Sequence, residues 1–502
     1  MYQLDETDES GNEFNVETTE NRKNPSYWRV VYKSRKQALS AIGGYILLLI
    51  SGLHIGWGIW RLFFYEPWMP GQPRPLFIFT KMSWYVAAIV GGAIGSGLVT
   101  VLRKHIIYYV CACILTISSI IYIIWYDEHI AIVVGRSIAG LGHGIVYLTT
   151  IIHVSENAAK EVRGMVVSLV NTMIFIGVAV SAVVLHTVTY HPGDSFSTDR
   201  ILGIIGLTLS VASAVCTIFL DIESVAYLLV RNKEIEAKDC LRNLRDEPNE
   251  TWRITDDIQE MHAMVQEDQK DGKNIFTEGN AKPLAYVSIF FVLGVLTNNY
   301  LTNIILFNFL AVPIGWSNFM LTAIILASVR AAMSIVSVFF CDIIGRKIHV
   351  TITGVTLFVT IIISIVIFFT SPHLWLFGSF AIIFQVFVAI GIDPIQHILL
   401  SEAFSTSKKP FSIAFVMAVE NSLQILFFGM YFIGAISSSD IYLLVACCIF
   451  SICALVLILL LLLPETKGMS LKEARDEFRD ENYSKHFFSG YDTFNCGCKH
   501  SR

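Results

Sequence analysis

Twelve long apolar runs organise the chain, and each is about 20 residues or longer, enough to cross a 30 Å hydrocarbon layer. Six lie near 41–63, 82–102, 105–125, 129–153, 164–189 and 201–220, and six near 283–310, 317–340, 349–370, 374–400, 411–435 and 440–463. The pattern predicts an all-α membrane protein with twelve transmembrane helices in two six-helix halves. The charged stretch between them predicts amphipathic surface helices around 233–246 and 255–268.

We therefore divide the chain into five parts. They are a polar N-terminal tail at 1–36, a first half at 37–220, a linker at 221–282, a second half at 283–463 and a C-terminal tail at 464–502. Basic residues concentrate in the tails, the linker and alternate loops. The positive-inside rule therefore places both termini and the linker in the cytosol.

Composition agrees with a bilayer environment. Hydrophobic residues make up 54% of the chain and charged residues 15%, against roughly 25% charged in soluble proteins. The net charge of −5 shows no basic excess, so we expect no nucleic-acid partner. The sequence has no phosphate-cradling motif and no nucleophile elbow. We expect neither an enzyme nor an ATP-driven pump, and no cofactor or metal; the oligomeric state is not indicated.

Charged motifs repeat between the two sets of runs at a nearly constant spacing. Ser155-Glu156 precedes Arg163 as Ser401-Glu402 precedes Lys409, and Glu223 and Glu465 follow the sixth and twelfth runs. This repetition predicts two halves related by a parallel repeat, with the solute site near the midplane between them.

The repeated charges predict a cytosolic latch that holds the halves together when the inner side is closed. Its expected members are Arg136, Glu156, Arg163, Glu223, Asp342, Arg346, Glu402 and Glu465. The alternative is that these groups only set topology and terminate helices.

Several motifs resemble the sugar porter family of the major facilitator superfamily. They are Gly135-Arg136 with the glycines after it, Ser155-Glu156 with Arg163-Gly164, the stretch from Asp342 to Lys347, and Pro464-Glu465-Thr466-Lys467-Gly468. The family includes facilitative glucose transporters and arthropod trehalose transporters. The resemblance implies alternating-access transport of a small sugar, facilitative or proton-coupled, in a multi-pass protein expected at the plasma membrane.

The resemblance also implies which residues bind the sugar. Asn171, Thr297, Asn298 and Asn303 keep the neutral hydrogen-bonding character of the family positions. Three positions depart from the family pattern: Arg330 replaces an asparagine, His397 a tryptophan, and Glu420, beside Asn421, another asparagine.

Arg330 lies roughly 18 Å from the cytosolic end of its run at 1.5 Å per residue, so it needs a buried acid. Glu420 and Asp393 are the candidates, and we favour Glu420. The solute could then be a neutral sugar, or a charged or zwitterionic one bound by these groups. Asp393, His397 or Glu420 could instead carry a proton. The pair could also only fix packing, in a transporter or in a solute sensor that does not transport.

Overall fold

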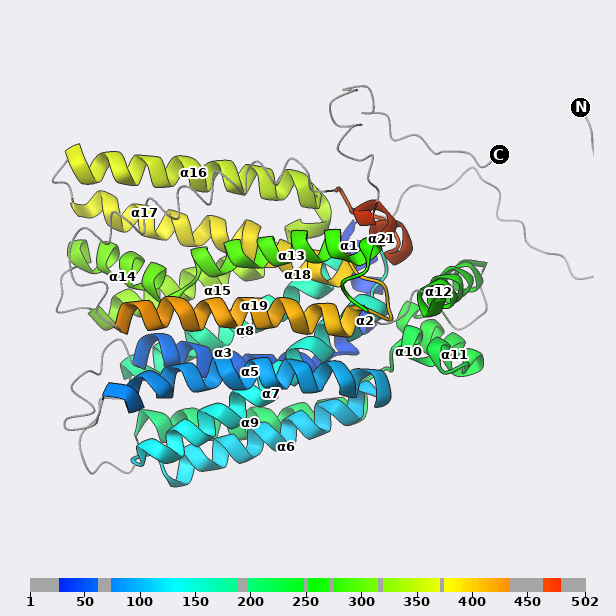
Figure 1. The fold of residues 1–502 in the computed structure, drawn as a ribbon, viewed down its shortest axis with the longest axis horizontal. Helices are drawn as coiled ribbons and strands as arrows, with labels where there is room; N and C mark the ends of the chain where they lie inside the picture. The colour runs from blue at the N-terminus through cyan, green and yellow to red at the C-terminus, as the bar shows by residue number, and fades with distance from the viewer. Residues whose placement is uncertain are drawn as a thin grey trace, which may run out of the picture.

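The computed structural model describes residues 27–61, 74–187, 197–247, 252–270, 274–314, 319–370, 374–432 and 464–479. These residues form helices and short connections, with no strand among them. Most of the long helices run side by side in one bundle (Figure 1).

The first half contains six membrane-crossing helices. They are α3 (Ile42–Gly56) with its π-helical extension η2 (Trp57–Arg61), α5 (Arg74–Val101), α6 (Lys104–Ile124), α7 (His129–Asn157), α8 (Arg163–Thr187) and α9 (Thr198–Leu220). Each overlaps one of the six expected runs. The second helix begins two turns earlier than its apolar run, because α5 starts at Arg74 and not near residue 82.

The second half repeats this arrangement with two broken helices. Its elements are α13 (Glu278–Thr297), α14 (Tyr300–Ile314), α15 (Phe319–Ile344), α16 (Arg346–Thr370), α17 (Leu374–Phe387), the π-helical η5 (Val388–Ile392), α18 (Asp393–Glu402) and α19 (Lys409–Phe432). The expected twelfth span at 440–463 lies outside the described residues. Within the described residues, ten helical segments are long and apolar enough to span a membrane.

The break between α13 and α14 is stabilised by Asn299. Its side chain donates to the carbonyl of Leu296 at 3.1 Å and accepts from the backbone N–H of Thr302 at 2.9 Å. Backbone groups freed inside a membrane need such internal partners. The Asn299 side chain therefore pairs two of the backbone groups that the break frees.

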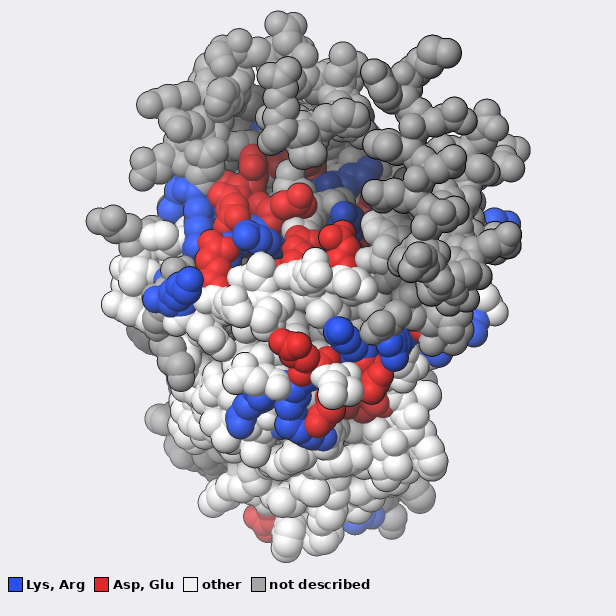
Figure 2. All heavy atoms as spheres, turned by 90° about the vertical axis from the view of Figure 1, so that its right-hand side faces the viewer, with Lys and Arg blue, Asp and Glu red and all other residues white. Residues whose placement is uncertain are grey.

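Six further helices, most of them short, gather at one end of the bundle, which we call the charged end. They are α1 (Tyr27–Lys33), α2 (Arg35–Leu39), α10 (Val225–Val230), α11 (Glu234–Arg245), α12 (Trp252–Lys270) and α21 (Leu471–Arg479). Ion pairs join them, for example Lys33 with Glu247 at 3.0 Å and Lys36 with Asp246 at 2.6 Å. Figure 2 shows acidic and basic side chains intermingled on this end.

Glycines allow α5 and α7 to pack backbone against backbone. A Cβ at Gly140 would lie 2.2 Å from the carbonyl oxygen of Trp84, and one at Gly144 would lie 2.3 Å from that of Ala88. Small residues permit this close approach in membrane helices. The glycine pattern of α7 thus serves packing, and it holds Trp84 beside the polar residues of α7.

Equivalent contacts in the two halves match the sequence repeat. Glu223 accepts from the backbone N–H of Lys104 at 3.1 Å, and Glu465 accepts from that of Arg346 at 3.0 Å. These carboxylates sit at the N-termini of α6 and α16, where the helix dipole favours negative charge. Likewise Glu156 accepts from the Ser224 hydroxyl, and Glu402 accepts from the Thr466 hydroxyl at 2.7 Å.

Candidate functional site

A cavity lies between the two halves, in the part of the bundle away from the charged end. Helices α3, η2, α5, α7 and α8 of the first half contribute to its wall, as do α13, α14, α18 and α19 of the second. Of the residues expected to bind the solute, Asn171, Asn298, Asn303, His397, Glu420 and Asn421 line this cavity.

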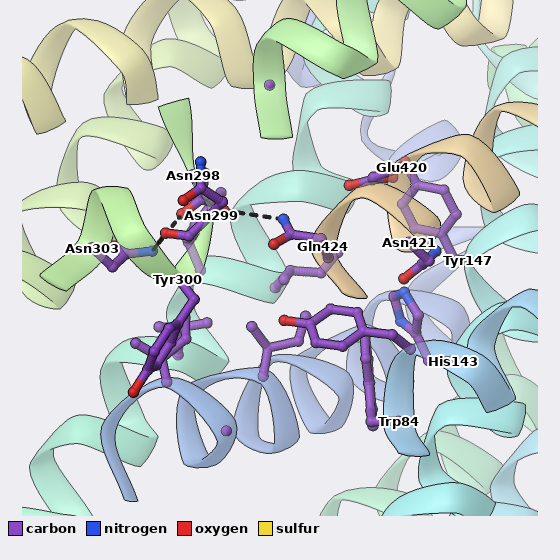
Figure 3. A pocket seen from close by; sticks show the side chains of 18 of the residues that line it. Trp84, His143, Tyr147, Asn298, Asn299, Tyr300, Asn303, Glu420, Asn421 and Gln424 are labelled. Carbon is purple, nitrogen blue, oxygen red and sulfur yellow. Dashed lines mark hydrogen bonds between the residues drawn. The ribbon is translucent and has the colours of Figure 1, made fainter. Parts of the chain in front are cut away.

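Amide groups form one side of the cavity around the helix break. The Asn303 amide donates to the Asn298 side chain at 3.3 Å, and the Gln424 amide donates to the Asn298 carbonyl at 3.1 Å. Figure 3 shows Gln424 and Glu420 on the side of α19 that faces Asn298 and Asn299. Amides present both donors and acceptors, which suits the recognition of hydroxyl groups.

Besides the Lys81 ammonium, four buried polar atoms of the cavity wall have no hydrogen-bond partner in the described part of the chain. They are Nε1 of Trp84, Nδ1 of His143, Nδ2 of Asn171 and Oε1 of Gln396. Most buried polar groups in folded proteins are paired, and each exception needs a reason. These atoms are free to bond a solute or a water molecule in the cavity.

Aromatic rings from both halves form a second side of the cavity. The ring centroids of Trp84 and His143 lie 4.7 Å apart, those of His143 and Tyr147 5.5 Å, and those of Tyr147 and His397 5.7 Å. Such rings give an apolar surface with polar edges, the usual composition of a small-molecule site.

Arg330 pairs with Asp393, which corrects the preference for Glu420. Its Nε lies 3.1 Å from Oδ2 of Asp393 and its Nη2 2.9 Å from Oδ1, while Nη1 donates to Gln385 at 2.7 Å. The guanidinium also stacks on Phe175 of the first half at 4.4 Å. A bidentate, fully buried pair of this kind satisfies both charges.

Glu420 is consequently left without a counter-charge. Its carboxylate lines the cavity and makes no hydrogen bond or ion pair with any residue that the structure describes. The cavity wall also carries Lys81 and Arg136, but neither forms an ion pair with Glu420. An ionised carboxylate in such a place is unfavourable without a cation or a proton.

Two expected ligands lie behind the cavity wall. The Thr297 hydroxyl donates within its own helix, to the carbonyls of Leu293 at 3.2 Å and Gly294 at 3.0 Å. Thr297 and Arg330 are not among the described residues that line the cavity. His397 does line it, and its Nδ1 lies 2.6 Å from the carbonyl oxygen of Asp393.

Arg136 lies in the cavity wall, which contradicts its assignment to the latch. It donates to the carbonyls of Thr80 at 3.0 Å and His54 at 2.8 Å, and its guanidinium stacks on Trp57 at 4.8 Å. Arg136 and Glu156 share α7 but are separated by twenty positions, about 30 Å along a helix. Arg136 therefore cannot reach Glu156 or the other acids at that end of the bundle.

Lys81 is a cavity residue that the sequence does not reveal. The apolar run near 82–102 makes Lys81 look like a loop charge, yet α5 begins earlier and carries it inside the wall. Its ammonium stacks on Tyr300 at 3.7 Å and on Phe428 at 4.9 Å. Tyr85, Tyr300 and Phe428 also line the cavity and were not expected there, since aromatic residues are common throughout membrane spans.

Charged groups at the charged end connect the two halves. Arg163 lies 3.6 Å from Glu402, and Asp342 accepts from the backbone N–H groups of Gly164 at 3.0 Å and Met165 at 2.7 Å. Arg346 lies 3.1 Å from Asp342 and 3.4 Å from Glu402. All these side chains are buried. The structure therefore holds the halves together at this end, whereas Glu223 and Glu465 act within their own halves.

Comparisons with known proteins agree with this architecture. The profile of the "sugar (and other) transporter" family matches residues 38–478. A glucose transporter of Staphylococcus epidermidis is 23% identical over 410 residues, covering 79% of this chain and 87% of its own. A facilitated trehalose transporter homologue of Drosophila simulans is 24% identical over 412 residues, covering 77% and 79%.

A solved structure shares the fold. The major facilitator proton:xylose symporter, with 6-bromo-6-deoxy-D-glucose bound, superposes with a TM-score of 0.71 at 17% identity, covering 90% of this chain and all of that one. This likeness identifies the major facilitator fold.

Proposed function

The chain belongs to the sugar transporter family, and we propose that it carries a small carbohydrate, a hexose or a trehalose-like sugar, across the membrane by alternating access between its two halves. The protein is an integral, multi-pass membrane protein. The observation that carries the proposal is a polar cavity between the halves, several of whose buried donors and acceptors have no partner among the described residues.

The cavity chemistry supports a hydroxylated solute. Asn171, Asn298, Asn303, Asn421 and Gln424 present amides to it, and Trp84 and Tyr147 present ring faces and edges. Paired amide contacts bind vicinal hydroxyls, and aromatic faces pack against the apolar side of a sugar ring. Thr297 and Arg330 act indirectly in this proposal, by supporting the helix break and by positioning Asp393.

The contacts at the charged end support alternating access. We propose that this end faces the cytosol and that Glu156, Arg163, Asp342, Arg346 and Glu402 form the inner latch. In this arrangement the inner side is closed and the cavity faces outward. Separation of Arg163 from Glu402 and of Asp342 from the start of α8 would open the inner side.

Glu420 is the proposed proton site if transport is coupled. Asp393 is held by Arg330 and His397 is engaged by a backbone carbonyl, so Glu420 is the acid in the cavity wall without a partner. Protonation would remove the unfavourable charge and could accompany each cycle.

Uptake into proteoliposomes tests the function. The full chain would be reconstituted and supplied with labelled glucose or trehalose at about pH 5.5 and about pH 7.5, which bracket histidine titration. Saturable uptake of either sugar supports the proposal. Acid-stimulated uptake that is lost in Glu420→Gln supports proton coupling, and pH-independent uptake supports a facilitative carrier.

If no transport is detected, a binding measurement distinguishes a solute sensor from a protein that does not recognise carbohydrates. Stabilisation of the protein by a sugar without uptake would favour a solute sensor. Neither uptake nor binding of any carbohydrate, by a monodisperse protein, would refute the proposal.

A further inference from the structure

Two buried cations lie in the cavity wall and neither has an acidic partner. Lys81 on α5 is 3% exposed and Arg136 on α7 is 1% exposed. Both line the cavity between the halves. The Arg136 guanidinium donates to the carbonyl of Thr80, the residue before Lys81, so the two side chains come from contacting segments of α5 and α7.

Only neutral groups contact these two cations in the described part of the chain. The Lys81 ammonium makes no hydrogen bond and lies over the rings of Tyr300 and Phe428. Arg136 is held by two backbone carbonyls and the Trp57 ring. Cation–π contacts and carbonyls reduce the unfavourable energy of a buried cation. They do not neutralise its charge.

The acids of the cavity cannot balance both cations. Asp393 and Glu420 are the described acids that line it, and Asp393 is already neutralised by Arg330. Two cations and one carboxylate remain. Buried charges inside a membrane protein are balanced by partners or by a ligand. The described residues that line the cavity therefore hold one more basic than acidic group without an ion-pair partner.

We propose that the solute is a monoanionic carbohydrate, a sugar acid such as a uronate or an aldonate, whose carboxylate binds between Lys81 and Arg136. This inference rests on the proposed function and narrows its substrate class. Asn298, Tyr300 and Asn303 all line the cavity, and the Lys81 ammonium lies over the Tyr300 ring. In this proposal the sugar hydroxyls reach the two amides while the carboxylate meets Lys81.

Charge also distinguishes a carboxylate from a phosphate ester. A single negative charge on the solute matches the one basic group in excess among the described residues that line the cavity. A phosphate dianion would add a second negative charge near Glu420, which repels it.

The test uses glucose and glucuronate, which differ only by oxidation at the sixth carbon. The full chain in proteoliposomes would be assayed for uptake of labelled glucose and labelled glucuronate, with glucose 6-phosphate as a competitor. The variants are Lys81→Met, which removes the charge, Lys81→Arg, which keeps it, and Lys160→Met, which removes an exposed lysine outside the cavity.

We expect wild type to prefer glucuronate over glucose. Lys81→Met should raise KM for glucuronate roughly ten- to one-hundred-fold, the effect of losing one charge-assisted hydrogen bond. The wild-type preference for glucuronate over glucose should fall by the same factor. Lys81→Arg and Lys160→Met should behave like wild type.

Three results would overturn the inference. They are a wild-type preference for glucose, an equal loss of both sugars in Lys81→Met, or stronger competition by glucose 6-phosphate than by glucuronate. If Lys81→Met does not fold, thermal stabilisation of wild type by glucuronate against glucose decides the same question. Absence of both binding and transport of every sugar would instead refute the proposed function itself.

Discussion

The pair formed by Arg330 and Asp393 gives the sharpest test of the structure. Either residue alone would be an uncompensated charge within the bundle, because both side chains are at least 95% buried. Removing one member of a buried pair destabilises a protein by about 3–5 kcal/mol, whereas replacing both by neutral groups is close to neutral. We therefore predict that Arg330→Gln and Asp393→Asn each destabilise the protein and that the double variant recovers.

The geometry supports the upper part of that range. The pair has two parallel hydrogen bonds, and Gln385 adds a third contact to the guanidinium. A loss of this much free energy of unfolding lowers the unfolding midpoint by on the order of 10 °C. Thermal unfolding of the purified protein, followed by size-exclusion chromatography after heating, measures it.

Glu420→Gln is the matched control. Because Glu420 has no counter-charge among the described residues, its neutralisation should leave the midpoint unchanged or raise it. A double variant no more stable than the weaker single variant would refute the pairing of Arg330 with Asp393. Recovery of Arg330→Gln by Glu420→Gln, and not by Asp393→Asn, would restore the pairing that the sequence favours.

Three further predictions concern packing, gating and coupling. Gly144→Ala should destabilise the protein by about 1–3 kcal/mol, because its Cβ would overlap the α5 backbone. Gly97→Ala should not destabilise it, because the space around Gly97 is open. The unfolding midpoints of the two variants measure the difference. Glu402→Gln should loosen the latch and expose the buried thiol of Cys341. Maleimide labelling at Cys341, measured by peptide mass spectrometry, should therefore rise. Unchanged labelling would count against a latch. Glu420→Gln should abolish any acid stimulation of uptake while binding persists, and stimulation that survives in this variant would exclude Glu420 as the proton site.

Much of the fold follows from the sequence because hydrocarbon imposes simple demands. A run must be about 20 residues long to cross the bilayer, and backbone groups inside it must be satisfied within the helix. These demands place the helices of the described part near their expected ranges. The repeated motifs also carry over into contacts, since Glu223 and Glu465 each bind the N-terminus of the equivalent helix in their own half.

The site is less predictable from the sequence, because the position of a residue along a helix does not determine the side of the helix on which its side chain lies. Arg330, Asp393 and Glu420 all lie at compatible depths, so the sequence cannot choose the acid that meets the arginine. The π-helical turn η5 immediately before Asp393 and the packing of α15 against it decide the pair. Thr297 likewise turns its hydroxyl into its own helix while Asn298, one residue later, reaches the cavity.

Helix boundaries explain the remaining differences. An apolar run identifies the hydrocarbon-facing part of a helix, and α5 extends two turns beyond it, which carries Lys81 into the cavity wall. Arg136 belongs to the opposite end of α7 from Glu156, as the length of the helix requires. The sequence thus determined the class, the two-half architecture and the residue types near the midplane. The tertiary structure decided which charges neutralise each other and which remain for a solute, because only packing fixes helix rotation and contact.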